Sequence, residues 1–278
     1  MSTDTMDPAT AVTYGPFIQA AEAQYSSDPS QVSPATITNM PAGYTLARTI
    51  QMTDFFGPEQ SRVFYGYVAV GGNPTTAVVA LRGTGSTMEW WDDFHWDLVP
   101  FTQIPADGKV AQGFYDIYNS IGTMAPGQEG ASAPSALAAD VAHAATSGPA
   151  AGIDPASLPL VVTGHSLGGA LATLLVTDLN ATTALEPQAW TFASPQVGDA
   201  TFAARYAALS KVSWRIYNQV DVVPHFPIDV SNSYQSVTTG YAINSLGKAK
   251  WSLSCAHSLN TYMHVLSPAT VPLDQACS

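Results

Sequence analysis

The residues from Gly164 to Gly168 place a serine, Ser166, between two glycines in the pattern G-x-S-x-G. Such a serine can attack an acyl carbon when it stands on a sharp turn between a strand and a helix, with its hydroxyl exposed. Alone the pattern is weak, because it occurs by chance in about one chain in ten, and a glycine-rich turn that only packs well is the alternative. Here an apolar run, Leu158–Thr163, precedes it and a helical stripe of leucines, Leu167–Leu179, follows it. Ser166 is therefore the candidate nucleophile, and the helix amino terminus behind it favours the negative charge that its attack creates.

A serine nucleophile needs a base to take its proton and a carboxylate to orient that base. In hydrolases with this turn, the acid and then the histidine follow the serine in the chain. Asp221 comes soon after the expected strand Ser213–Tyr217, where catalytic loops gather; a turn-capping aspartate is the alternative. His257 stands at an expected junction of loop and helix, the mobile kind of position that an acid–base histidine needs. The other aspartates after Ser166 are one within the helix that follows it (Asp178), one that begins another helix (Asp199), Asp229 and Asp274. The other histidines are one in a loop (His225) and one that packs or caps (His264).

Strands and helices are expected to alternate along the chain. This alternation predicts an α/β protein with a mainly parallel central sheet and helices on both faces, the α/β-hydrolase architecture. We find no repeat or linker and expect one domain over residues 1–278. The low-charge stretch Leu158–Leu179 is interpreted as a buried strand followed by a buried helix rather than as a membrane span. The expected strands are 44–55, 62–70, 77–81, 158–163, 189–193 and 213–217, and the expected helices are 14–25, 112–121, 134–145, 167–179 and 199–209.

The composition argues against several classes of function. Hydrophobic residues make up 46% of the chain and charged residues only 11%, which indicates a sizeable core and not a disordered chain. The net charge is −12, with 9 Lys and Arg and no basic cluster, so we expect no binding to nucleic acid or to anionic membranes by phosphate neutralisation. A neutral or apolar substrate is favoured. No residue pattern indicates a metal site or a phosphate-binding loop, and no cofactor is expected.

The two cysteines, Cys255 and Cys277, leave two interpretations open. A disulfide that closes the C-terminal segment and holds the loop before His257 is favoured if the protein is secreted, and two free thiols if it is cytoplasmic. No signal peptide is visible at the N-terminus. We expect a secreted or extracellular protein, with a cytoplasmic one left open.

Several segments together resemble the fungal-type triacylglycerol lipases, also called class 3 lipases, and they occur in that family's order. This resemblance implies the α/β-hydrolase fold and a catalytic triad of Ser166, Asp221 and His257. It also implies an oxyanion hole from Thr84, by its backbone N–H and its hydroxyl, and from the backbone N–H of Leu167. The matching segments are 79–84, 113–118, 163–172, 191–198, 215–218 and 221–224, and His257 with Tyr262 behind it.

In that family the segment after the oxyanion residue forms a mobile lid, which here corresponds to residues 85–98. Trp90, Trp91, Phe94 and Leu98 fall on one helical face, as expected for an amphipathic helix that covers an apolar cleft or lies on a lipid surface. An ordinary surface helix with its apolar face permanently in the core is the alternative.

The resemblance implies a lipase that cleaves fatty-acid glycerol esters through an acyl-enzyme. An apolar ester at a lipid–water interface is the expected substrate, with no nucleic-acid partner, no integral membrane segment and a monomeric state. A phospholipase A1 or a feruloyl or short-chain carboxylesterase on the same fold is the alternative. A catalytically inactive binding protein fits least, because every triad and oxyanion position is filled.

Overall fold

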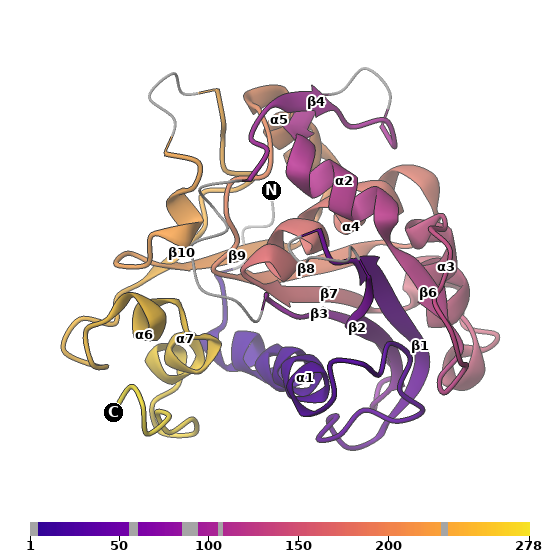
Figure 1. Cartoon of the computed structure of the whole chain (residues 1–278), viewed down its shortest axis with the longest axis horizontal. Coiled ribbons are helices and arrows are strands. Elements are labelled where there is room, and N and C mark those ends of the chain that lie inside the picture. The colour runs from indigo at the N-terminus through magenta and orange to yellow at the C-terminus, as the bar shows by residue number, and fades with distance from the viewer. Residues whose placement is uncertain (1–4, 56–60, 85–93, 105–107, 229–232) are drawn as a thin grey trace.

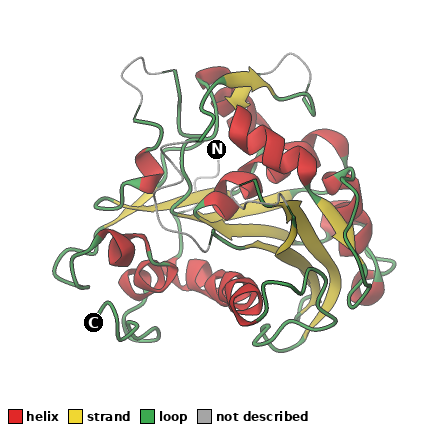
Figure 2. Cartoon of the chain, in the orientation of Figure 1, coloured by secondary structure: helices red, strands yellow, loops and turns green. Residues whose placement is uncertain are grey.

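The computed structural model of the protein describes residues 5–55, 61–84, 94–104, 108–228 and 233–278. Within these residues, eight strands form one sheet in the order β10-β9-β8-β7-β3-β2-β1-β6, with helices above and below it (Figures 1 and 2). The strands are β1 (Tyr44–Thr53), β2 (Arg62–Gly71), β3 (Thr76–Leu81), β6 (Gly122–Met124), β7 (Leu160–His165), β8 (Pro187–Phe192), β9 (Ser213–Asn218) and β10 (Tyr241–Ile243).

Five neighbouring strands of the sheet are parallel: β3, β7, β8, β9 and β10. The strands β1, β2 and β6 continue the sheet beyond β3 in antiparallel pairs. The carboxyl ends of the parallel strands therefore lie at one edge of the sheet, which is where ligands bind in folds of this kind. β7, which ends at His165, is central in the sheet, with β3 on one side and β8 on the other.

Helices cover both faces of the sheet (Figure 2). On one face lie α1 and α7, with α6 beside α7, and on the other lie α2, α3, α4 and α5. The side chains of the central strands alternate accordingly: Val79 and Val162 belong to the α4 side, whereas Val78 and Val161 belong to the α1 side. The helices are α1 (Pro8–Ser27), α2 (Gln112–Ser120), α3 (Leu137–Ala145), α4 (Leu167–Thr182), α5 (Ala200–Leu209), α6 (Leu253–His257) and α7 (Leu259–Leu266).

The longest helix, α1, begins where its sequence indicates. Asp7 caps it by accepting hydrogen bonds from the N–H groups of Ala9 and Thr10, and Pro8 occupies a first-turn position where no N–H is needed. Its apolar face, which includes Ile18 and Ala21, packs against the sheet and α7. The same helix carries Glu22 to the neighbourhood of the carboxyl end of β7.

The main elements that the sequence predicts are confirmed, with boundaries that differ by a few residues. α1 begins six residues earlier than expected, at Pro8, because Asp7 and Pro8 form its first turn. The stretch Leu158–Leu179 contains β7 and most of α4, and among the described residues no helix is long and apolar enough to cross a membrane. The sequence did not predict the three-residue strands β4 (Leu98–Pro100), β5 (Lys109–Ala111), β6 and β10.

One expectation about the segment 85–98 is wrong. Leu98 does not continue a helix from Phe94: it begins β4 and lies opposite Ala111 of β5 in an antiparallel pair. Pro100 is consistent with the difference, because a proline disfavours helical backbone in the residue before it, here Val99, so a helix could not have continued beyond Leu98. Phe94 is buried against the rings of Trp96 and Phe114, at centroid distances of 4.6 Å each. Trp90 and Trp91 lie outside the described residues.

Candidate active site

Ser166 stands on the turn between β7 and α4 with φ 57° and ψ −124°, a backbone conformation that an L-residue rarely adopts. Two glycines make this turn possible. A Cβ on Gly164 would lie 2.3 Å from the carbonyl oxygen of Gly168, and a Cβ on Gly168 would lie 2.4 Å from the carbonyl oxygen of Arg82. A larger residue at Gly164 would push β7 away from the first turn of α4, and one at Gly168 would push α4 away from the end of β3. The N–H of Ser166 donates to the carbonyl of Phe192 at 3.0 Å, which ties the elbow to β8.

His257 and Asp221 complete a chain of hydrogen bonds that begins at Ser166. The Oγ of Ser166 lies 2.9 Å from Nε2 of His257, and Nδ1 of His257 lies 2.8 Å from Oδ2 of Asp221. Because a carboxylate only accepts, Nδ1 of His257 carries the proton and Nε2 is free to accept one from the serine. Ser166 and Asp221 are almost fully buried. The three residues that the sequence selected are thus brought together in the geometry of a nucleophile, its base and the carboxylate that orients the base.

Asp221 is held by two further donors. The hydroxyl of Tyr262, on α7, donates to Oδ2 of Asp221 at 2.8 Å, and the N–H of Val223 donates to Oδ1 at 3.0 Å. Burial and the Asp221 carboxylate raise the pKa of Tyr262 well above its usual range, so its phenol keeps its proton and remains a donor. With both oxygens occupied, the carboxylate has one orientation toward the histidine.

Asn218, the last residue of β9, ties the segment before His257 to the sheet. Its side-chain amide donates to the carbonyl of Ala256 at 2.9 Å and to the hydroxyl of Ser245 at 2.8 Å, and its Oδ1 accepts from the N–H of Ser245. All of these groups are buried. Because the side-chain amide of Asn218 has all of its hydrogen-bond partners, it fixes the position of the main chain just before His257 relative to the sheet.

A disulfide joins Cys255, within α6, to Cys277, with 5.5 Å between the two Cα atoms. The N–H of Lys250 also donates to the carbonyl of Cys277 at 2.8 Å. The five-residue helix α6, which ends at His257, is therefore attached both to β9 and to the C-terminal segment. His257 lies at the end of a short, braced helix rather than on a loose loop.

The protonation of His257 is governed by opposing effects. Burial lowers its pKa below the ordinary 6.5, and although the hydrogen bond and the charge of Asp221 raise it, the net direction is down. A neutral imidazole at neutral pH is the form that can accept a proton from a serine hydroxyl. The arrangement can therefore carry out general-base activation of Ser166.

The two segments that are expected to supply the oxyanion donors both lie next to Ser166. Leu167 is the first residue of α4, so its N–H is one of the helix donors without a partner inside the helix. Gly83, which precedes Thr84, lies directly against the elbow: a Cβ on it would be 3.5 Å from Cβ of Ser166. The guanidinium of Arg82 donates to the carbonyl of Gly83 at 2.7 Å. Because a trans peptide points its C=O and N–H in opposite directions, the N–H of Thr84 points away from Arg82.

Four other aspartates and histidines of the C-terminal half have separate positions. Asp178, on α4, accepts from the hydroxyl of Tyr118 on α2 and from that of Thr182 on its own helix, and Asp199 caps α5 by accepting from the N–H of Phe202. His264 lies on α7 with Nδ1 2.7 Å from the carbonyl of Val271, and His225 lies exposed in a short 3-10 turn. These positions agree with the sequence analysis, which did not select any of the four residues for the triad.

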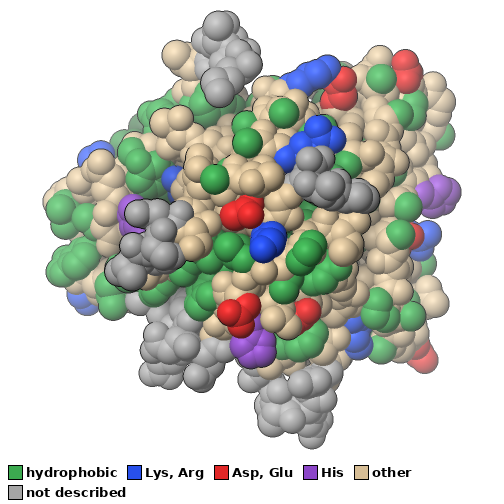
Figure 3. Space-filling model, turned by 90° about the horizontal axis from the view of Figure 1, so that it is seen from above, with side chains coloured by type: hydrophobic (Ala, Val, Ile, Leu, Met, Phe, Trp, Pro, Cys, Tyr) green, Lys and Arg blue, Asp and Glu red, His purple; other side chains and the backbone are tan. Residues whose placement is uncertain are grey.

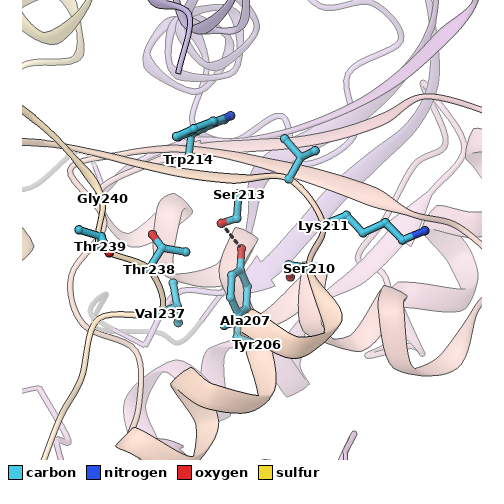
Figure 4. A pocket seen from close by; sticks show the side chains of 11 residues that line it. Tyr206, Ala207, Ser210, Lys211, Ser213, Trp214, Val237, Thr238, Thr239 and Gly240 are labelled. Atoms are coloured by element: carbon cyan, nitrogen blue, oxygen red, sulfur yellow. Dashed lines mark hydrogen bonds between the residues drawn. The ribbon is translucent and has the colours of Figure 1, made fainter. Parts of the chain in front are cut away.

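A pocket of about 260 Å³ lies away from the triad, between α5, β9 and residues 237–240 (Figure 4). Tyr206 and Ser213 face each other across it and share a hydrogen bond of 2.8 Å. Lys211 at its rim pairs with Glu186. None of Ser166, Asp221 and His257 lines this pocket, so it is not the place where an ester would meet Ser166.

Comparison with known proteins supports the same assignment of fold. The sequence profile of the family "Lipase (class 3)" matches residues 78–231, more than half of the chain, and this stretch includes Ser166 and Asp221. The chain belongs to the class 3 lipase family. His257 lies beyond the matched residues, so its place in the triad depends on its contacts with Ser166 and Asp221.

Proteins similar in sequence to this chain include plant phospholipases A1. Phospholipase A1-IIgamma of Arabidopsis thaliana is 29% identical over 225 residues, which cover 72% of this chain and 52% of that protein. Phospholipase A1-II 3 of Oryza sativa subsp. japonica is 29% identical over 232 residues, which cover 73% and 53%. The chain thus spans about half the length of these curated relatives.

Solved structures of fungal lipases share the fold of this class 3 family member. A mutant form of MDLA from Penicillium cyclopium is 24% identical with a TM-score of 0.64, and the match covers 91% of this chain and 86% of that one. Lipase II from Rhizopus niveus is 21% identical with a TM-score of 0.61, covering 85% and 80%. These likenesses establish the α/β-hydrolase architecture.

Sequence reasoning missed the groups that support the triad. Asn218 and Arg82 lie within segments that resemble the family, but nothing local in the sequence assigns them hydrogen bonds to Ala256 and Gly83. The side chain of His165, inside the serine motif, was also passed over. Its position next to Ser166 in a strand-to-helix turn was the signal that could have drawn attention to it.

Proposed function

We propose that the protein hydrolyses carboxylic esters of lipids through an acyl-enzyme on Ser166. The observation that carries this proposal is the hydrogen-bond chain from Ser166 through His257 to Asp221, at 2.9 and 2.8 Å. Membership of the class 3 lipase family supports the choice of an ester substrate.

The reaction follows from the positions of these groups. As Oγ of Ser166 forms a bond to the acyl carbon, its proton passes to Nε2 of His257 and the carbonyl electron pair moves onto the oxygen. The N–H groups of Leu167 and Thr84 stabilise that oxyanion. The intermediate collapses, the leaving alkoxide takes the proton from Nε2, and the acyl group stays on Ser166. A water molecule then repeats the sequence, releasing the fatty acid and restoring the serine.

We propose acylglycerols with long chains, presented at a lipid–water interface, as the substrate class. The names of relatives support two versions of this proposal: lipases among the structural neighbours and phospholipases A1 among the plant relatives. Cleavage of triacylglycerol is our first choice, and phospholipase A1 activity is the second. A feruloyl or short-chain carboxylesterase is the third.

An exposed apolar surface next to the triad supports an interfacial substrate. We call the segment from Leu246 to Leu253, which follows β10 and ends at the first residue of α6, the apolar loop. It carries three of the large exposed hydrophobic side chains among the described residues, those of Leu246, Trp251 and Leu253. Lys248 and Lys250 are its only charged residues, so its charge does not oppose contact with lipid phosphates. The loop leads directly into α6 and His257, and Figure 3 shows hydrophobic side chains gathered toward the end of the molecule where Figure 1 places this segment.

We also propose that the protein acts in an oxidising compartment, as a secreted enzyme would. The Cys255–Cys277 bridge supports this, because disulfides persist outside the reducing cytosol.

Substitution of Ser166 tests the proposed reaction. Ser166→Ala is expected to reduce ester turnover by at least about a thousandfold, because the nucleophile is removed. The exposed Ser254→Ala is the matched control and should retain full turnover. A fluorophosphonate should label the unaltered protein and the control, but not Ser166→Ala. Turnover by Ser166→Ala near that of the unaltered protein would overturn the proposal.

The acyl preference separates the substrate classes. Nitrophenyl esters of increasing acyl length distinguish a lipase, which accepts long chains, from a short-chain esterase. Release of the sn-1 fatty acid from phosphatidylcholine, measured beside release from trioleoylglycerol, distinguishes the phospholipase from the lipase.

A further inference from the structure

The imidazole of His165 contacts the residue that carries the base. Nε2 of His165 lies 2.7 Å from the main-chain carbonyl oxygen of His257, and the centroids of the two rings are 4.7 Å apart. On the other side, Nδ1 of His165 lies 3.5 Å from Oε1 of Glu22, on α1. His165 is buried and Glu22 is half-buried. Glu22 and His165 thus form a second carboxylate–imidazole pair that contacts His257, separate from the bond between Asp221 and His257.

The partners of His165 dictate where its protons are. A carbonyl oxygen only accepts, so Nε2 must carry a hydrogen. In a neutral imidazole Nδ1 would then be an acceptor, and it would face a carboxylate that also accepts. The conflict disappears when a proton lies between Nδ1 and Oε1, which makes His165 an imidazolium paired with Glu22. Burial by itself lowers the pKa of His165, but Glu22 and the carbonyl of His257 outweigh it and the net direction is up.

We propose that Glu22 and His165 form a positioning pair for the base, in which His165 donates from Nε2 to the carbonyl of His257 and Glu22 keeps His165 charged. The first part fixes the main chain of His257, and hence the distance from its Nε2 to Ser166. The second part places a positive charge beside the imidazole of His257, where it opposes a second positive charge. The pair thereby helps to keep His257 in the neutral form that accepts the serine proton.

Other charged and titratable groups surround this pair. The charge of Asp221, in the loop after β9, raises the pKa of His165. The ring of Tyr262, on α7, lies edge-on to that of His165, with 6.4 Å between the ring centroids. Arg82, which follows β3, interacts with Glu22 through the opposite charges of the two side chains. At His257, the charge of His165 lowers the pKa more than the charge of Glu22 raises it. Removal of the charge on both residues is therefore expected to raise the pKa of His257.

The role of the pair in turnover rests on the proposed function, since it acts through His257 as base. Three variants separate hydrogen bonding from charge. His165→Leu removes the donor, and His165→Gln keeps a neutral N–H donor toward the carbonyl. Glu22→Gln removes the carboxylate, but its amide can donate to Nδ1 of a neutral His165, so the geometry survives without the charge. The exposed Glu186→Gln, whose carboxylate pairs with Lys211, controls for the loss of one negative charge.

The test combines kcat per fluorophosphonate-titrated site, KM, the pH profile of kcat/KM with a soluble ester, and NMR titration of the histidines. We expect His165→Leu to lower kcat per titrated site by about tenfold or more with little change in KM, because the base is displaced. His165→Gln should restore most of that loss. Glu22→Gln should retain kcat at the optimum, lower the pKa of His165 and move the acid limb of the kcat/KM profile toward higher pH. Glu186→Gln should also retain kcat, but it should change neither the pKa of His165 nor the acid limb.

Two results would overturn the proposal. If His165→Leu keeps the kcat of the unaltered protein, or if His165→Gln is as impaired as His165→Leu, His165 does not position the base by donation. If Glu22→Gln leaves both the titration of His165 and the acid limb unchanged, Glu22 does not hold the charge. The NMR titration needs no turnover, so it tests the pairing even if the unaltered protein fails to hydrolyse esters, which would refute the proposed function separately.

Discussion

The hydroxyl of Tyr262 donates to Oδ2 of Asp221, the same oxygen that accepts from His257. The phenol oxygen in turn accepts from the buried N–H of Asn218 at 2.9 Å. Tyr262→Phe would leave that N–H and one acceptor position of the carboxylate without a partner. We expect a loss of about 1–3 kcal/mol in the free energy of unfolding and a fall in kcat of less than about tenfold, because Val223 still holds the other oxygen.

Denaturant unfolding and steady-state kinetics would measure both effects. Tyr14→Phe is the matched control, since that ring packs against Trp190 in the same helical layer. Equal stability of the two variants would show that the bond to Asp221 contributes nothing measurable.

Arg82 holds the peptide between Gly83 and Thr84, whose N–H we propose as an oxyanion donor. Besides donating to the carbonyl of Gly83, it donates from Nε to the carbonyl of Phe64 at 2.8 Å, and it lies 3.5 Å from the centroid of the Tyr25 ring. A lysine cannot reproduce this planar set of contacts. We expect Arg82→Lys to lower kcat by about tenfold to a hundredfold with a smaller change in KM, because an oxyanion donor acts mainly in the transition state.

The matched control for Arg82 is Arg62→Lys. Arg62 also bonds buried carbonyls, those of Gln51 and Ser120, but at the far side of the sheet. It should lose stability and keep kcat per titrated site. A fall in kcat that is equal in the two variants would point to general loosening of the fold instead of a misplaced oxyanion donor.

The lowered pKa of His257 sets the expected pH dependence of turnover. The base acts only when neutral, so kcat/KM is full above the pKa of His257 and is lost as the pH falls through it. Because burial moves that pKa below 6.5, the acid limb of the kcat/KM profile should lie below 6.5. The measurement is kcat/KM for a soluble ester across the acid range, with NMR titration of His257 in Ser166→Ala as an independent readout. An acid limb above 6.5 would contradict the prediction.

The apolar loop is expected to contact lipid. Trp251→Ala combined with Leu246→Ser should weaken binding to phosphatidylcholine vesicles by about tenfold, because two large side chains lose apolar area that would leave water. Co-sedimentation of proteins that also carry Ser166→Ala measures binding without hydrolysis. The exposed Phe55→Ala, on another part of the surface, is the control. Unchanged binding by the loop variant would assign lipid contact to a different surface.

The parts of the fold that the sequence predicts are those with a strong local pattern. β7 and α4 were predictable because an apolar run meets the glycine–serine turn and then a leucine stripe. The three-residue strands β6 and β10 have no such pattern: they exist because β1 and β9 offer them partners. Leu98 was assigned to a helix because its spacing from Phe94 fits one, and the pairing with Ala111 overrides that spacing.

The same distinction applies to the site. Ser166 and Asp221 are marked by the elements that precede them, and His257 by its expected junction of loop and helix and by the family resemblance. The donors around them come from distant parts of the sequence: Glu22 and His165 are brought together only when α1 docks on the sheet, and Tyr262 meets Asp221 only when α7 does. No local pattern in the sequence carries such contacts.

The bond between Ser166 and His257 joins residues that are 91 positions apart in the chain. Long-range pairings of this kind form late in folding, because closing a long loop is entropically unfavourable until much of the structure is in place. The nucleophile therefore becomes reactive only in molecules whose C-terminal helices have reached β7. Labelling by a fluorophosphonate during refolding would count the molecules in which His257 has reached Ser166, while circular dichroism would register the helices earlier.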